Sequence, residues 1–344
     1  MTRFILVFSS FLLFFLSPFL AHAQTTTSPY GERIFYYSTL KSNVADFTAY
    51  AKDIDIVAPQ TYEVTYNLNA SGTVPTDLYQ AAQTAHVKVM PLIANHNFSQ
   101  SIMRGLLASS TAQTALTSFL VSEAQTKGYI GWQFDFEHIA SSDRDLFSAF
   151  VIKATAALHA HGLILSIAVV AQAPGSASSD TSSSFYKNWS GAYDYASLAS
   201  STDFISLMTY DDPDSKGASA PLPFVKSVLN NILSQVPPSK ISLGISLFYW
   251  GWNTANPPVR LNSGGTYAAA MQRAKDYPSF QGFNSSVGVP WIIYKLGQKI
   301  YIIWYENVQS FQLKASLINT YHLRGFSAWV LGNEDPAIWN VLGN

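Results

Sequence analysis

The sequence has no cysteine and few charged residues. Asp, Glu, Lys and Arg together make up 12% of its 344 residues. Without cysteine the protein has no disulfides, no cysteine-ligated zinc and no thiol nucleophile. The net charge of −1 and the lack of any basic block give nucleic-acid binding little electrostatic support. None of the seven His residues falls in the HExxH spacing of a zinc-binding helix, so we expect no metal site and no cofactor.

The N-terminal segment has the pattern of a secretory signal peptide. Arg3 supplies a positive charge, an apolar run follows, and residues 21–23 form a small-x-small cleavage site. We therefore expect residues 1–23 to be removed and residues 24–30 to form a short exposed leader. The mature protein would be secreted or bound to the cell envelope, with no stable membrane span. An uncleaved anchor is the alternative, because the apolar run is close to spanning length.

Apolar and aromatic side chains are abundant, at 48% and 14% of the residues. From residue 31 onward, short apolar runs alternate with polar loops and helical patterns. Nearly continuous apolar runs are typical of parallel strands buried on both faces. We predict strands at 33–37, 54–58, 87–94, 131–136, 163–170, 204–209, 241–248 and 325–331. We predict helices at 76–84, 111–127, 142–161, 224–236, 307–322 and 336–342. This alternation predicts an α/β fold, a (β/α)8 TIM barrel.

One connection is too long for a simple loop. Residues 253–305, between the seventh strand and its helix, contain a helical pattern at 266–275 and β-rich runs at 290–294 and 299–304. We predict a small α+β insertion beside the active-site face of the barrel. The sequence shows no tandem repeat, so we expect residues 31–344 to form one catalytic barrel that acts as a monomer.

The fourth predicted strand carries the most informative pattern. Residues 131–137 read Gly-Trp-Gln-Phe-Asp-Phe-Glu. Because side chains alternate along a strand, the aromatic ones face the helices, and Gln133, Asp135 and Glu137 face the barrel interior. A structural polar network is the alternative. It does not explain why two carboxylates lie toward the carboxyl end of the strand, where barrel enzymes place catalysis. Adjacent carboxylates also push their pKa values apart, so that one can stay protonated as an acid.

This segment resembles the signature of family 18 glycoside hydrolases, DxxDxDxE on the fourth strand. Asp135 and Glu137 match the last Asp and the Glu of that pattern. Gln133 stands at the middle Asp position and Ile130 at the first. An amide at the middle position is similar to the branch typified by spore-peptidoglycan and cortex-lytic hydrolases, where Asn is usual.

Four further segments carry the resemblance in the expected order. Residues 208–211 (Met-Thr-Tyr-Asp) are similar to the family's MxYD motif at the end of the sixth strand. Residues 244–251 look like its seventh-strand motif, and residues 328–332 resemble its eighth-strand motif with a tryptophan floor. Residues 58–62 match the cortex-lytic branch at the second strand. The resemblance covers about residues 31–342.

The resemblance implies substrate-assisted retaining hydrolysis of glycans that contain N-acetylglucosamine, in which the substrate's acetamido oxygen attacks the anomeric carbon. It implies that Glu137 protonates the leaving oxygen and then activates water. Asp135 would hold the acetamido N–H, and Tyr210 would hydrogen-bond the acetamido oxygen. Asp211 would bind near the same subsite, and Trp329 would form the apolar floor under the reacting sugar.

Gln133 completes the set of catalytic candidates. It can hydrogen-bond Asp135 but cannot ionise, so the rate could be low or the pH optimum shifted. Four more residues are candidates for substrate binding, each with packing as the alternative role: Met208, Tyr249, Tyr62 and Gln60.

We therefore predict a secreted hydrolase that cleaves β-1,4 linkages in peptidoglycan or chitin-like glycans. A non-catalytic, lectin-like barrel that binds chitin or peptidoglycan is the alternative from another class. A barrel that acts on another polysaccharide through paired carboxylates is a third possibility. It would leave the MxYD and tryptophan motifs unexplained. The sequence does not separate chitin from peptidoglycan as the substrate.

Overall fold

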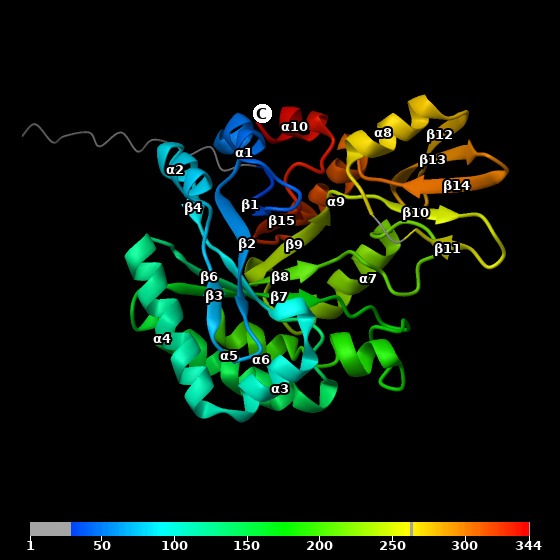
Figure 1. Ribbon diagram of the computed structural model, residues 1–344. Helices are drawn as coiled ribbons and strands as arrows, with labels where there is room; N and C mark the ends of the chain where they lie inside the picture. Colours follow the sequence, from blue (N-terminus) through cyan, green and yellow to red (C-terminus); the bar gives the residue numbers. More distant parts are fainter. Residues whose placement is uncertain (1–28, 262–263, 344) are drawn as a thin grey trace, which may run out of the picture.

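Eight parallel strands close into a barrel in the computed structural model, which describes residues 29–261 and 264–343 (Figure 1). The ring closes because β1 pairs with both the last strand and the second one. In order around the barrel the strands are β1 (Glu32–Tyr37), β15 (Gly325–Trp329), β9 (Ile241–Ser246), β8 (Phe204–Met208), β7 (Ile164–Val170), β6 (Gly131–Asp135), β5 (Leu92–Asn95) and β2 (Ile56–Val64). The predicted barrel fold is confirmed.

The third strand departs from the prediction. The run expected at 87–94 is divided into β4 (Lys88–Val89) and β5, and both parts pair with β2. Pro91 lies at the break, where a residue without a backbone N–H cannot continue the ladder. A short strand that the sequence did not predict, β3 (Ala70–Gly72), pairs antiparallel with the end of β2.

Helices cover the outside of the barrel (Figure 1). They are α1 (Val44–Tyr50), α2 (Thr76–Thr84), α3 (Gln100–Ala108), α4 (Ser110–Lys127), α5 (Arg144–His159), α6 (Tyr195–Ser201), α7 (Leu222–Leu233), α9 (Val308–Tyr321) and α10 (Trp339–Leu342). The longer helices match the predicted ranges within a few residues. The prediction missed α1, α3 and α6, which have only seven to nine residues and so give little helical periodicity.

The core has an outer and an inner part. Outward strand side chains pack against the helices, and the indole of Trp132 also donates to the carbonyl of Leu120 in α4 at 2.8 Å. An inner apolar cluster that includes Ile34, Met90 and Phe204 fills part of the barrel interior. The outer layer accounts for the aromatic residues that alternate with polar ones along β6.

The insertion forms a lobe with its own sheet, drawn in yellow and orange in Figure 1. Its strands are β10 (Trp250–Asn253), β11 (Val259–Arg260), β12 (Ser279–Asn284), β13 (Val289–Leu296) and β14 (Lys299–Trp304), in the antiparallel order β11-β10-β14-β13-β12. One helix, α8 (Tyr267–Asp276), packs on this sheet. The sheet begins at Trp250, three residues before the predicted start, because the chain leaves β9 at Ser246 and enters β10 after a short connection.

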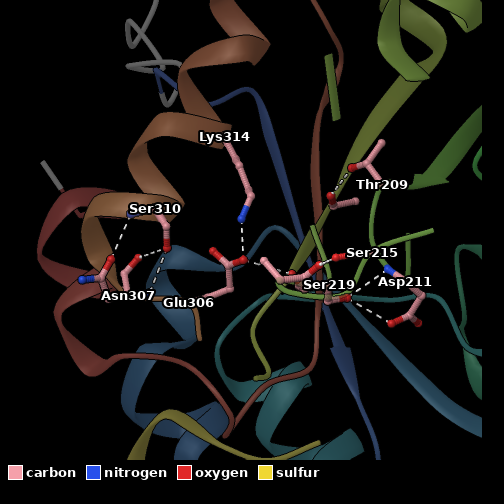
Figure 2. A network of polar contacts seen from close by, with 11 residues as sticks. Thr209, Asp211, Ser215, Ser219, Glu306, Asn307, Ser310 and Lys314 are labelled. Atoms are coloured by element: carbon pink, nitrogen blue, oxygen red, sulfur yellow. Dashed lines mark hydrogen bonds and ion pairs between the residues drawn. The ribbon is translucent and has the colours of Figure 1, made fainter. Parts of the chain in front are cut away.

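A buried ion pair joins the end of the lobe to the barrel. Glu306 follows β14, and its carboxylate accepts from the ammonium group of Lys314 in α9 (Figure 2). The two residues are 5% and 1% exposed. The hydroxyl of Ser246, at the end of β9, donates to the same carboxylate at 3.4 Å. The pair therefore fixes the point where the chain returns from the lobe to the barrel.

Replacing Lys314 tests this ion pair. Lys314→Met should lower the free energy of unfolding by about 3 kcal/mol, because Glu306 would stay buried without its counter-charge. Urea denaturation measures the change. Lys226→Met, at an exposed position of α7, is the matched control and should change stability little. A loss for Lys314→Met no larger than that of the control would contradict the assignment.

The predicted signal segment at 1–23, and all but the last two residues of the predicted leader at 24–30, lie outside the described residues. Within residues 29–261 and 264–343, none of the helices combines the length and apolar character needed to cross a membrane.

Candidate active site

A cavity of about 990 Å³ opens among the barrel loops and the lobe. Its lining comes from segments far apart in the sequence, and several of these residues lie at or just after the carboxyl ends of strands. This is the face on which (β/α)8 enzymes carry catalysis. Seven of the ten site residues predicted from the sequence line the cavity: Gln60, Asp135, Glu137, Met208, Tyr210, Asp211 and Trp329.

Asp135 and Glu137 both face this cavity, as the alternation along β6 predicted. Asp135 is the last residue of β6 and is 5% exposed. Glu137 lies two residues further on and is half-buried. One side chain of the cavity wall contacts the pair directly, since Nε2 of Gln60 donates to Oδ2 of Asp135 at 3.4 Å. The two carboxyl groups therefore share one cavity, whose wall is more apolar than polar.

Burial separates the protonation behaviour of the two carboxyls. It raises the pKa of Asp135 to about 6, against the opposing effect of the hydrogen bond from Gln60. The pKa of Glu137 is raised well above its ordinary value by burial first, and then by the negative charges of Asp135 and Asp211. The two groups titrate as a coupled pair. Because the charge of Asp135 adds to burial in raising the pKa of Glu137, the arrangement favours an ionised Asp135 beside a Glu137 that keeps its proton, which is the state an acid catalyst requires.

The backbone of Glu137 is held from two sides. Asn95, at the end of β5 and 1% exposed, accepts from the N–H of Glu137 and donates to its carbonyl, both at 3.0 Å. The amide of Asn95 also donates to the carbonyl of Ser99 at 3.1 Å. From the loop after β7, the hydroxyl of Tyr193 donates to the carbonyl of Phe136 at 2.8 Å. These bonds set the direction in which the Glu137 side chain enters the cavity.

Asn95 is thus a positioning residue, and its truncation tests that role. Asn95→Ala should lower kcat by about 10- to 100-fold with a smaller change in KM, because a displaced Glu137 loses reaction geometry rather than substrate contacts. The measurement is steady-state kinetics, with circular dichroism to confirm folding.

Asn231→Ala is the matched control, since that amide donates to the carbonyl of Gln172 at 3.0 Å outside the cavity lining. An equal fall in kcat for both variants, or a fall for Asn95→Ala that follows its folded fraction, would show that Asn95 is only structural.

Tyr210 and Asp211 follow β8 directly. Tyr210 is 9% exposed, and burial raises the pKa of its hydroxyl well above the ordinary value, so it stays a hydrogen-bond donor. Asp211 has a left-handed backbone, with φ of 58°. The hydroxyl of Ser219 accepts from the N–H of Asp211 at 2.9 Å and donates to its carboxylate at 3.0 Å (Figure 2). This double contact fixes the Asp211 carboxylate at the edge of the cavity.

Trp329 ends β15 and lies in the cavity wall, joined to Val330 by a cis peptide bond. Its ring lies 5.4 Å from the ring of Tyr36, another lining residue. The sequence therefore placed an apolar aromatic surface on the correct strand and the correct face.

Gln133 does not contact Asp135, and that expectation is wrong. Its amide donates to the hydroxyls of Ser166 and Ser206 at 2.9 and 2.7 Å, on the two strands beyond β6. It is fully buried and does not line the cavity, and its Oε1 has no hydrogen-bond partner among the described residues. The Gln133 side chain is one methylene longer than Asn, but its amide does not hydrogen-bond Asp135. It reaches the hydroxyls of Ser166 and Ser206 instead.

Tyr62 lies outside the cavity, contrary to the sequence interpretation. The pairing of β2 with β5 shifts register between Gln60 and Tyr62, so an extra residue on β2 breaks the alternation. Gln60 faces inward, whereas Tyr62 packs among the helices, 4.8 Å from the ring of Trp132, and donates to Glu123 at 2.8 Å. A bulge of this kind leaves no mark in the hydrophobic pattern.

Tyr249 also lies outside the cavity. It comes after β9 has ended and belongs to the lobe, where it packs with Ile292 and Tyr294. Its N–H donates to the carbonyl of Gly265 at 2.8 Å, and a Cβ at Gly265 would come within 2.4 Å of the Tyr249 ring. Tyr249 does not line the cavity, but it positions the lobe segment at Gly265, which does.

The sequence interpretation missed several lining residues. The aromatic ones are Tyr36, Phe98, Phe185, Trp189, Phe248, Trp250 and Trp252. Most of them lie in loops or in the lobe, where strand alternation does not select them. Phe248 and Trp250 belong to the motif at residues 244–251 but were not named as site residues. In the described part of the chain, no group of three or more His, Asp or Glu side chains is arranged to hold a metal ion.

Comparison with known proteins agrees with this geometry. The sequence model of glycosyl hydrolases family 18 matches residues 27–334. An uncharacterized glycosylase of Bacillus subtilis, YvbX, is 24% identical over 91% of this chain and 90% of its own. The cortical fragment-lytic enzyme of the same organism is 29% identical over 78% of this chain and 62% of its own.

Solved structures show the same fold. The chitinase from Chromobacterium violaceum has a TM-score of 0.80 and 27% identity, covering 91% of this chain and 98% of its own. The spore cortex-lytic enzyme SleL of Bacillus megaterium has a TM-score of 0.81 and 24% identity, covering 93% of this chain and 75% of its own.

Proposed function

The chain belongs to glycosyl hydrolases family 18 and is a glycoside hydrolase, and from that premise we propose that it cleaves β-1,4 linkages in N-acetylglucosamine-containing glycans by substrate-assisted, retaining catalysis. The observation that carries the proposal is the pair Asp135 and Glu137 in one cavity, where burial and the charge of Asp135 raise the pKa of Glu137 well above its ordinary value. A second carboxylate nucleophile is not needed when the substrate's acetamido group attacks.

Three lining residues each have a role in this reaction. The protonated Glu137 donates its proton to the glycosidic oxygen as the bond to the anomeric carbon breaks. The ionised Asp135 accepts the acetamido N–H and stabilises the positive charge of the oxazolinium ion. The hydroxyl of Tyr210 donates to the acetamido oxygen and aligns it for attack. The Glu137 carboxylate then takes a proton from a water molecule as this water attacks the anomeric carbon and opens the oxazolinium ring. The second displacement restores the original anomeric configuration.

Two features support binding of an extended glycan. Trp329 offers an apolar face beside the carboxyl pair, and the cavity volume of about 990 Å³ is at the upper end of the range for ligand sites. Among the relatives, one is named a cortical fragment-lytic enzyme, which supports a bacterial cell-wall glycan as the substrate. The chitinase with the same fold supports a chitin-like glycan.

We also propose that the protein acts as a monomer outside the cytoplasm, as a secreted or envelope-bound enzyme. The apolar run after Arg3 and the small residues around His22 support export. The sequence of the N-terminus of the protein recovered from culture medium would test cleavage after residue 23.

Product analysis tests the proposed reaction. The purified protein is incubated with chitin oligomers and with purified peptidoglycan, and mass spectrometry identifies the fragments. We expect new reducing ends at N-acetylglucosamine, and proton NMR at early times should show the β-anomer first. An initial α-anomer, or cleavage of a glycan that has no N-acetyl group, would contradict the mechanism. Binding of oligomers without turnover would favour the lectin-like alternative.

A further inference from the structure

Three cationic side chains line the cavity: Lys41 from the loop after β1, Lys216 from the loop after β8, and Arg260 from β11 of the lobe. We call these three residues the cation corner. All three are exposed, and none of them lies within 4 Å of a carboxylate in the part of the chain that the structure describes. Their charges are therefore available to a ligand.

Two members of the cation corner lie over a tryptophan ring. The ammonium nitrogen of Lys41 is 5.9 Å from the ring centroid of Trp329, and the guanidinium carbon of Arg260 is 4.3 Å from that of Trp250. Cations at this distance from an aromatic face are held in place by the ring. The positions of these two charges are thus coupled to aromatic surfaces that line the same cavity.

The Lys216 loop is tied to the lobe next to Arg260. The indole of Trp252 donates to the carbonyl of Gly217 at 2.7 Å, and Trp252 pairs with Arg260 across the β10–β11 ladder. The loop that carries Lys216 is therefore bonded to the residue that pairs with Arg260. Both cations line the cavity on the side of the lobe.

The cavity's charges are unevenly distributed. Desolvation raises the pKa of Asp211, and the charges of Arg260 and Lys41 partly oppose this rise, so these charges act in the region of the reacting sugar. The wall made by the loops after β5 and β7, with Phe98, Phe185 and Trp189, contributes no charged side chain to the lining. A neutral sugar polymer can accept hydrogen bonds from these cations but lacks the charge attraction that a carboxylate adds.

We propose that the cation corner binds a carboxylate carried by the glycan, so that the cavity selects carboxylated N-acetylhexosamine chains over neutral N-acetylglucosamine polymers. Arg and Lys form strong, charge-assisted hydrogen bonds with carboxylates. The lactyl ether of N-acetylmuramic acid is one such substituent. The inference rests on the proposed hydrolase function and names the chemistry of its substrate.

The test compares three oligosaccharides with wild type and with a Lys216→Gln/Arg260→Gln double variant. They are chitotetraose, a tetrasaccharide of alternating N-acetylglucosamine and N-acetylmuramic acid with free carboxylates, and the same tetrasaccharide with its carboxylates converted to methylamides. For wild type, kcat/KM should be highest on the free carboxylate. In the double variant, the ratio of kcat/KM on the free carboxylate to kcat/KM on either other substrate should fall about tenfold, because hydrogen bonds between charged groups are lost. Lys226→Gln, far from the cavity lining on α7, is the charge control.

Equal loss on all three substrates, or an unchanged preference in the double variant, would overturn the inference while leaving the hydrolase function in place. If wild type cleaves none of the three, the hydrolase function fails instead. Calorimetric binding of the same oligosaccharides, with Glu137→Gln added to each protein, then tests the cation corner without turnover. The cation corner is supported if the protein without the double substitution binds the free-carboxylate tetrasaccharide more tightly than the other two and the double variant does not. Equal affinities for all three oligosaccharides reject it.

Discussion

Glu137→Gln should lower kcat by about 10³- to 10⁴-fold, because the amide keeps the shape of the side chain but cannot transfer the proton to the leaving oxygen. The structure indicates that this substitution changes the carboxyl group without disturbing the backbone. Asn95 and Tyr193 hold the backbone on either side of the residue, and neither contact involves the carboxyl group. The variant should therefore fold normally. Release of reducing ends measures turnover, and calorimetry with a chitin oligomer measures binding.

Binding should persist or tighten in this variant. The amide has the shape of the protonated acid, and burial and the neighbouring carboxylates favour that form of Glu137 by raising its pKa. Glu123→Gln is the matched control, since that carboxyl group is bonded by Tyr62 on the helical side of β2. It should leave turnover almost unchanged. A Glu137→Gln enzyme with wild-type kcat would reject Glu137 as the acid.

The sequence predicted the parts of the site that depend on strand periodicity. Asp135 and Glu137 face the cavity because alternation along a regular strand admits only two faces. Tyr210 and Trp329 were predicted from the family resemblance, and both line the cavity at the ends of β8 and β15. A residue that ends a barrel strand is positioned by the whole barrel, so its place can be predicted as soon as the strand is recognised.

The sequence could not predict features that depend on contacts between distant segments. The register shift on β2 turns Tyr62 toward the helices, and it arises from pairing with β5 rather than from local composition. Gln133 donates hydrogen bonds to serines of β7 and β8. Strand alternation predicts that Gln133 faces inward, but it does not predict which inward residues it contacts. Asn95 had a usable signal, since it is a polar residue directly after an apolar run.

Asp135→Asn should lower kcat by about 10³-fold, because an amide cannot stabilise the positive charge of the oxazolinium ion as a carboxylate does. The pH dependence gives a second readout. Asp135 must be ionised, and burial raises its pKa to about 6, so wild-type activity should fall as the pH drops through about 6. Glu137 must be protonated, so activity should also fall as the pH rises through its elevated pKa.

The variant changes both limbs of that profile in a defined way. Asn does not titrate, so the acidic limb near pH 6 should disappear from the residual activity. Removing the Asp135 charge also removes one of the causes that raise the pKa of Glu137, so the alkaline limb should move to lower pH. Asp145→Asn, at an exposed position of α5, controls for the loss of one charge and should keep both limbs. An acidic limb that survives in Asp135→Asn would mean that another group, such as Asp211, supplies the ionised carboxylate.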